Sequence, residues 1–197
     1  WMEYETLVEQ LFHHSINAKI DCVEVVTPSL VRAGTMLAEC LLSDGKVLVC
    51  GNGGSSLNAQ FFATTLMNQG ERERPGLPAI VLDNSSAMLT AIENDYGLND
   101  AFARQIRALG QAGDRLVIFT RTGIPANLLN AVTAAHERDM VVIAITAQDG
   151  GHLPVLLSDR DIEIRVPLAS RFRIYENHLL LSFALCELIE YQMFGGT

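Results

Sequence analysis

Short apolar runs separated by longer segments with helical spacing divide this chain. Apolar runs occur at residues 47–49, 78–82, 116–119 and 141–145. Near-continuous runs of this kind are typical of parallel strands that are covered on both faces. Residues 162–166 alternate apolar and polar side chains instead, which predicts a fifth strand at an edge of the sheet. The pattern predicts an α/β protein with a doubly wound, five-stranded parallel sheet.

Helices are predicted before, between and after these strands. Apolar positions recur at three to five residues over 3–26, and a second helix is expected over 28–43 because Thr27-Pro28 resembles a cap followed by a first-turn proline. Further helices are expected over 57–69, over 85–109 with a break near 94–97, over 125–137 and over 171–194. We therefore divide the chain into N-terminal helices, 1–45, expected to mediate oligomerisation, and one α/β domain, 46–197. The alternative is a helical cap folded on its own domain.

Composition excludes several functional classes. The 197 residues are 49% hydrophobic and 19% charged, which indicates a sizeable core. The formal net charge is -9, which argues against direct contact with nucleic acid or with an anionic membrane surface. The cysteines, Cys22, Cys40, Cys50 and Cys186, show no metal-binding spacing and are expected to be reduced core thiols in a cytoplasmic protein.

A glycine-rich turn follows the first strand and is the first candidate site. Residues 51–56 read Gly-Asn-Gly-Gly-Ser-Ser, between the strand and a helix. Glycines allow the backbone to approach a ligand, and the N–H groups of a helical first turn suit an anion. The P-loop pattern fails because the turn has no lysine, and the dinucleotide-binding spacing G-x-G-x-x-G fails because Ser56 stands where a glycine is needed. A sugar phosphate is the expected ligand; a tight turn without a ligand is the alternative.

A second hydroxyl-bearing loop follows the third strand. Residues 120–125 read Thr-Arg-Thr-Gly-Ile-Pro. Parallel strands end at one edge of the sheet, where ligands of doubly wound folds bind, so both loops are expected to meet there. Threonine and proline are also ordinary helix-start residues, so plain capping is the alternative.

Four ordered motifs together resemble the SIS (sugar isomerase) domain proteins of the phosphoheptose isomerase branch. They lie at residues 50–55, 74–80, 91–97 and 149–151, and the resemblance covers nearly the whole chain. It implies a five-stranded parallel sheet, a homotetramer and a phosphosugar site between subunits. The implied phosphosugar-binding residues are Asn52, Gly53, Gly54, Ser55, Thr120 and Thr122, with Asp95 near the sugar.

The chain departs from this family in the second loop and at the implied metal site. The family loop usually reads Ser-Thr-Ser-Gly-Asn-Ser, whereas Ile124 and Pro125 occupy its last two positions here. The isomerases of this branch look zinc-dependent and carry His-Phe-Ala-x-Glu after the glycine turn, where this chain has Phe61 and Thr65. Of the expected metal positions only His178 remains, and one imidazole cannot hold zinc. We therefore predict no metal and no cofactor, with zinc expected only if the protein is an isomerase.

The functional prediction that follows is a non-catalytic protein. Residues 58–60, 104–114 and 185–190 look closer to a non-enzymatic branch, the DiaA proteins, which bind the replication initiator DnaA and promote chromosome replication. By this resemblance DnaA is the expected partner, and Met193 and Phe194 are candidate contacts, with burial against another subunit as the alternative. No catalytic residue is assigned, although Asp95, Glu176 and His178 are residual candidates.

Two other functions stay open. One is a phosphoheptose isomerase acting on sedoheptulose 7-phosphate with a rearranged site. The other is a phosphosugar sensor that binds ligand without chemistry. Fold alone cannot choose among the three, because one scaffold hosts many functions.

Overall fold

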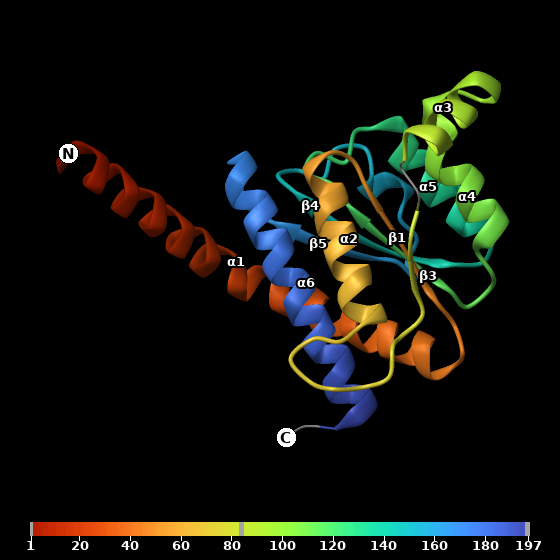
Figure 1. Ribbon diagram of the computed structural model, residues 1–197, viewed down its shortest axis with the longest axis horizontal. Coiled ribbons are helices and arrows are strands. Elements are labelled where there is room, and N and C mark those ends of the chain that lie inside the picture. Colours follow the sequence, from red (N-terminus) through yellow and green to blue (C-terminus); the bar gives the residue numbers. More distant parts are fainter. Residues whose placement is uncertain (1, 83–84, 196–197) are drawn as a thin grey trace.

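The computed structural model describes residues 2–82 and 85–195 and shows a parallel five-stranded sheet between helices (Figure 1). The strand order is β2-β1-β3-β4-β5, and each neighbouring pair is parallel. This confirms the predicted doubly wound sheet and the edge position of the last strand. The strands are β1 (Val47–Gly51), β2 (Ala79–Val81), β3 (Arg115–Phe119), β4 (Val141–Ala147) and β5 (Ile162–Val166).

The helices largely match the predicted segments. The break near residues 94–97 is confirmed, because α3 ends at Asp95 and a short 3-10 turn, η1, follows before α4. A second such turn, η2, follows β4. The elements are α1 (Met2–Leu42), α2 (Gly54–Met67), α3 (Ser86–Asp95), η1 (Leu98–Asp100), α4 (Ala101–Leu109), α5 (Ala126–Glu137), η2 (Pro154–Leu156) and α6 (Arg171–Phe194).

Side chains alternate along each strand and build a separate core on each face of the sheet. On one face Val49, Val117 and Ile143 pack with α1, α2 and α6. On the other face Leu48 and Ile118 pack with α4 and α5. Because both faces are covered, every residue of β1 and β4 is buried, which explains their continuous apolar sequence.

The prediction of two N-terminal helices is wrong, because α1 is one continuous helix with Pro28 inside it. Proline lacks an N–H and removes one intrahelical hydrogen bond. Hydroxyls beside it bond to the helix backbone, Thr27 Oγ1 to the Val23 carbonyl and Ser29 Oγ to the Val26 carbonyl. The turns that flank the proline pack on α6 and β5, and this tertiary packing outweighs the local cost of the proline.

The first half of α1 projects away from the sheet, and its second half lies against it (Figure 1). Apolar side chains of the projecting half are exposed, among them Leu7, Leu11, Phe12 and Ile16. By length and hydropathy the helix contains a window apolar enough to cross a membrane, but 44% of that window is buried inside the protein. Burial under the sheet therefore accounts for part of this apolar character.

A buried carboxylate joins β4 to the loop before β5. Asp161 accepts hydrogen bonds from Val142 N (2.7 Å), Ser158 N (2.7 Å) and Ser158 Oγ (2.8 Å), and it contacts His136 Nε2 (2.8 Å). Burial raises the pKa of Asp161, but these hydrogen bonds outweigh burial and hold the pKa below its ordinary value.

We expect Asp161→Asn to destabilise the protein at neutral pH by about 1–3 kcal/mol, because an amide oxygen cannot accept all these bonds. A lowered carboxylate pKa contributes stability above the ordinary value, about pH 4, that disappears as pH falls through the lowered pKa. The difference between wild type and variant should therefore shrink on acidification. Urea unfolding from pH 7 to pH 3 measures this, with exposed Asp159→Asn as the control; a difference independent of pH would contradict it.

Candidate functional site

The candidate site lies at the carboxyl edge of the sheet, where the strand order reverses. The chain leaves β1 to form β2 on one side and returns to form β3 on the other, so a crevice opens between the loops that follow β1 and β3. A pocket of about 100 Å³ occupies this crevice. Its lining residues are Asn52, Ser55, Phe119, Thr120, Arg121, Thr122, Pro125 and Tyr175. The structure thus brings together the two loops that the sequence singled out.

The turn after β1 is tighter than the sequence suggested, since α2 begins at Gly54. Gly53 has a positive φ of 55°, which favours glycine. A Cβ on Gly51 would lie 2.8 Å from the Ser55 carbonyl, and one on Gly54 would lie 2.7 Å from the Tyr175 ring. Glycines are therefore required for the turn to fit between β3 and α6, and the first-turn N–H groups of α2 lie beside the pocket.

Several side chains of this turn are already hydrogen-bonded within the chain. The amides of Asn52 and Asn127 exchange two hydrogen bonds of 2.9 Å and join the turn after β1 to the first turn of α5. Ser56 Oγ donates to the Gly53 carbonyl (2.7 Å), a bond within the first turn of α2. Ser55 is buried in the pocket wall. The sequence analysis missed Asn127, because a helical asparagine carries no local signal of a partner 75 residues away.

The loop after β3 is held in place from both sides. Gly123 N donates to Thr120 Oγ1 (3.0 Å), and His152 N donates to the Gly123 carbonyl (3.1 Å). Gly123 has a positive φ of 62°, and a Cβ there would lie 1.8 Å from the Gly150 carbonyl oxygen. The glycine pair 150–151 after β4 thus supports the loop, a role its sequence motif did not reveal.

Arg121 also lines the pocket, and the sequence analysis did not single it out. Its Nε is shielded from solvent and has no hydrogen-bond partner among the described residues. None of the ion pairs found in 2–82 and 85–195 includes this side chain. Among the described residues, the cation in the pocket wall therefore has no counter-ion.

The predicted sugar contact Asp95 lies away from this pocket. It is exposed at the end of α3 and lines a groove between α3 and α4 together with Tyr96 and Arg104. Figure 1 shows α3 at an outer corner of the molecule. Within one chain, Asp95 is therefore not grouped with the residues of the two loops.

Glu176 is engaged between helices. Its carboxylate accepts hydrogen bonds from Lys19 Nζ (2.6 Å) and from Ser15 Oγ of α1, and it contacts Arg173 Nη1 (2.9 Å). Burial raises the pKa of Glu176, but the bonds from Lys19 and Ser15 outweigh it and the pKa is lowered. An ionised, paired carboxylate is a weak proton acceptor, so this geometry indicates a link between α1 and α6.

His178 lies in the core. It is fully buried beside Phe119, its Nε2 lies 3.0 Å from the Thr146 carbonyl oxygen, and its Nδ1 has no partner among the described residues. Burial lowers the pKa of His178 to about 4, so the ring is neutral at pH 7. It is not among the residues that line the crevice pocket.

Two of the positions implied for a metal, Phe61 and Thr65, line a different groove, of about 320 Å³, between α2 and α6, whereas Tyr175 lines the crevice and His178 lies in the core. Phe61 and Phe183 form an edge-to-face pair there, with ring centroids 5.1 Å apart, next to Thr65. Burial raises the pKa of Cys186, which also lines the groove, to about 12, so its thiol is protonated. Among residues 2–82 and 85–195 no group of three His, Cys, Asp or Glu is arranged to hold a metal ion. The donor set does not fit zinc.

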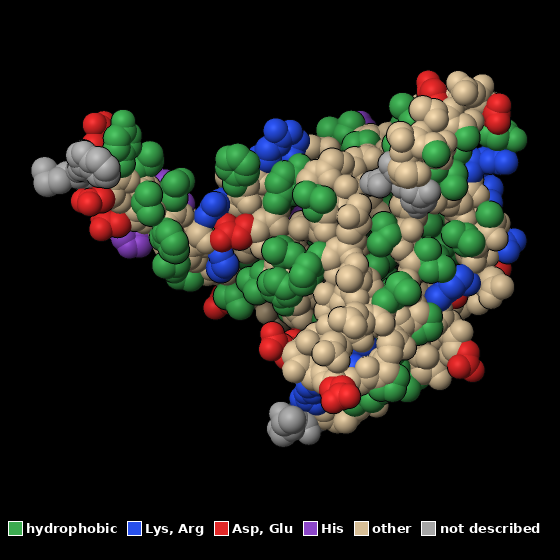
Figure 2. Space-filling view, in the orientation of Figure 1, with side chains coloured by type: hydrophobic (Ala, Val, Ile, Leu, Met, Phe, Trp, Pro, Cys, Tyr) green, Lys and Arg blue, Asp and Glu red, His purple; other side chains and the backbone are tan. Residues whose placement is uncertain are grey.

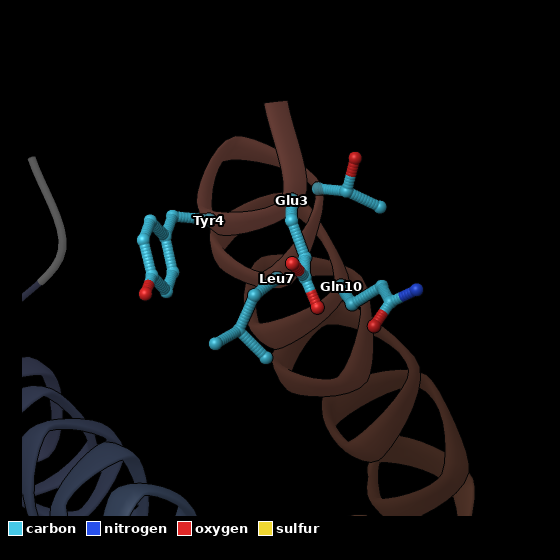
Figure 3. A pocket seen from close by; sticks show the side chains of 5 residues that line it. Glu3, Tyr4, Leu7 and Gln10 are labelled. Carbon is cyan, nitrogen blue, oxygen red and sulfur yellow. The ribbon is translucent and has the colours of Figure 1, made fainter. Parts of the chain in front are cut away.

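Two further surface features lie apart from the crevice. A surface hollow of about 500 Å³ is lined, among the described residues, by Glu3, Tyr4, Thr6, Leu7 and Gln10, which all belong to α1 (Figure 3). The candidate contacts at the end of α6 do not form one exposed patch. Met193 is partly buried against the core, whereas the exposed fraction of Phe194 is 46%.

Comparison with known proteins supports the phosphosugar interpretation. Residues 12–147 match the family model described as SIS domain. The chain is 47% identical over 196 residues to a phosphoheptose isomerase of Chromohalobacter salexigens, with 100% of each chain covered. It is 48% identical to that of Methylococcus capsulatus, covering 95% of this chain and 96% of the relative. A solved phosphoheptose isomerase from Francisella tularensis is 42% identical with a TM-score of 0.90, over 94% of this chain and 97% of that one.

These relatives contradict the prediction of a non-catalytic tether for DnaA. Proteins similar over the full length carry the name of the isomerase, and this favours the alternative function. The short stretches that suggested the tether are poor markers of a partner. Leu185, Cys186 and Ile189 are buried in the core against the sheet, so packing constrains them.

Proposed function

The chain belongs to the SIS domain family, and we propose that it is a phosphosugar isomerase of the phosphoheptose isomerase type. The observation that carries the proposal is the crevice between β1 and β3, where the first turn of α2 and the loop after β3 present anion donors to one pocket. Relatives 47–48% identical along nearly the whole chain bear the name of this activity.

The proposed role of the crevice is to hold the phosphate group of the substrate. Ser55, Arg121 and Thr122 line it, and Gly53 and Gly54 directly precede Ser55 at the start of α2. A phosphate accepts hydrogen bonds from such donors in several directions, which fixes one end of the sugar. Holding one end of the substrate positions its carbon chain for reaction.

Aldose–ketose interconversion also needs a group that moves a proton between neighbouring carbons. Among the described residues that line the crevice, the titratable side chains are Arg121 and Tyr175. We assign the acid/base group to a second copy of the chain, with the exposed carboxylate of Asp95 as the candidate. The groove at Phe61, Thr65 and Phe183 does not fit zinc, so no step is assigned to a metal there.

A homotetramer is part of the proposal. Hydrophobic side chains lie along the projecting half of α1 and over α6 and α2 (Figure 2). These include Leu11, Ile20, Phe172 and Phe183, and an apolar surface of this extent favours association. Association would bring a second copy next to the crevice.

The direct test is incubation of the purified protein with sedoheptulose 7-phosphate, with product detected by NMR. We expect conversion to an aldose phosphate that survives treatment with a chelator, and we expect Asp95→Asn to lower the rate about 10²- to 10⁴-fold, as for loss of a general acid or base. Asp159→Asn serves as the control. Absence of conversion with the assembly intact would overturn the isomerase proposal.

A phosphosugar sensor is the second candidate, and the Phe61–Phe183 pair favours it. The Phe61 ring has no proton to transfer, and it stands at a position where the family resemblance implies a metal ligand. A sensor would raise its melting temperature on adding the sugar phosphate, because the ligand binds only the folded state, but would show no conversion.

A further inference from the structure

We propose that Arg121 is the principal phosphate ligand of this protein, so that the site recognises phosphate by a guanidinium where other members of the family use a loop rich in hydroxyls. This inference rests on the proposed phosphosugar function and names the side chain that binds the phosphate. The observation behind it is an arginine in the wall of the crevice without an ion-pair partner among the described residues.

Several polar groups near the pocket are already engaged or absent, which leaves the hydroxyls of Ser55, Thr120 and Thr122 in its lining. Asn52 and Asn127 bond to each other, and Ser56 Oγ bonds to the Gly53 carbonyl. Pro125 precedes α5 and offers neither an N–H nor a hydroxyl, and Ile124 is exposed and apolar. The turn of α2 alone would hold a phosphate with backbone N–H groups and few side chains.

The guanidinium supplies what these positions lack. It is always charged, and its planar array of donors matches two phosphate oxygens at once. Leaving a cation in a pocket without a counter-ion costs free energy, and Arg121 Nε is shielded from water without a hydrogen-bond partner among the described residues. An anion in the crevice would supply that partner.

The backbone that carries Arg121 is held in place before any ligand arrives. Thr120 N donates to the Ile145 carbonyl (2.9 Å), and Thr120 Oγ1 accepts from Gly123 N (3.0 Å). Gly123 lies directly against Gly150. A loop fixed on both sides of Arg121 loses little conformational entropy on binding, so less of the interaction free energy is offset and the affinity is higher.

The test is isothermal titration of the full-length protein with inorganic phosphate and with sedoheptulose 7-phosphate. We expect Arg121→Met to weaken both affinities about 10- to 100-fold, as for loss of a charge-assisted hydrogen bond. The affinities of Arg121→Lys should lie between those of wild type and Arg121→Met, because lysine keeps the positive charge but lacks the planar pair of N–H donors. The control is Arg160→Met, which removes the same charge from an exposed loop outside the crevice and should leave affinity unchanged.

The outcomes separate this inference from the proposed function. If wild type binds both ligands and Arg121→Met binds them equally well, the inference is wrong and the phosphosugar function stands. If wild type binds neither ligand, both are overturned. The melting temperature without ligand checks folding of each variant, and equal weakening by Arg160→Met would show a general charge effect and contradict a direct role.

Discussion

Replacing Arg74 by methionine is expected to destabilise the protein by about 3–5 kcal/mol, because it leaves the buried charge of Glu190 without its partner. The two side chains are 2% and 1% exposed, and Arg74 Nε lies 2.7 Å from Glu190 Oε1. Arg74 also donates to the carbonyls of Thr65 (2.9 Å) and Leu66 (2.8 Å) in the last turn of α2. The substitution therefore removes an ion pair and the cap of α2 together.

Chemical denaturation of wild type and Arg74→Met measures this difference. The matched control is Arg107→Met, which breaks the Arg107–Glu137 pair, of similar geometry but exposed to solvent, and should change stability little. Combining Arg74→Met with Glu190→Leu should recover part of the loss, since no uncompensated charge remains. A double variant less stable than Arg74→Met alone would contradict this explanation.

Gly123→Ala is expected to destabilise the protein by about 2–4 kcal/mol and to weaken phosphate binding. The positive φ is unfavourable for alanine, and the new Cβ would lie 1.8 Å from the Gly150 carbonyl oxygen, so one backbone segment must move. Relieving this clash would displace the loop that carries Arg121 and Thr122 relative to the turn of α2. Denaturation and phosphate titration of the same sample measure both effects.

Gly113→Ala is the matched control for this prediction. Gly113 also has a positive φ, 92°, but a Cβ there has no atom within 4 Å. Gly113→Ala therefore measures only the destabilisation caused by a positive φ at alanine. It should destabilise the protein less than Gly123→Ala and should leave phosphate affinity unchanged. Equal effects of the two substitutions on affinity would contradict a role for the contact between the two loops.

Local sequence predicted the sheet because four strands coincide with apolar runs between helical segments and the fifth alternates apolar and polar side chains. The alternation of Leu48 and Val49 between two cores follows from the period of a strand and needs no tertiary information. The same reasoning failed at Pro28. The local rule places a proline at a helix start, but packing of the turns on both sides of Pro28 keeps the helix continuous. It also failed for function, because buried positions such as Leu185 and Ile189 were treated as markers of a partner.

The sequence by itself determined the parallel sheet, the two loops at its carboxyl edge and the absence of a histidine and a glutamate at Phe61 and Thr65, since each depends on residues close together in the chain. Only the tertiary structure decided that Arg121 lines the crevice with no ion-pair partner in the described part of the chain, that Asn127 bonds Asn52, and that His178 lies in the core. The physical reason is that these relations join residues far apart in the chain. Their partners and burial exist only once the sheet and its helices have packed.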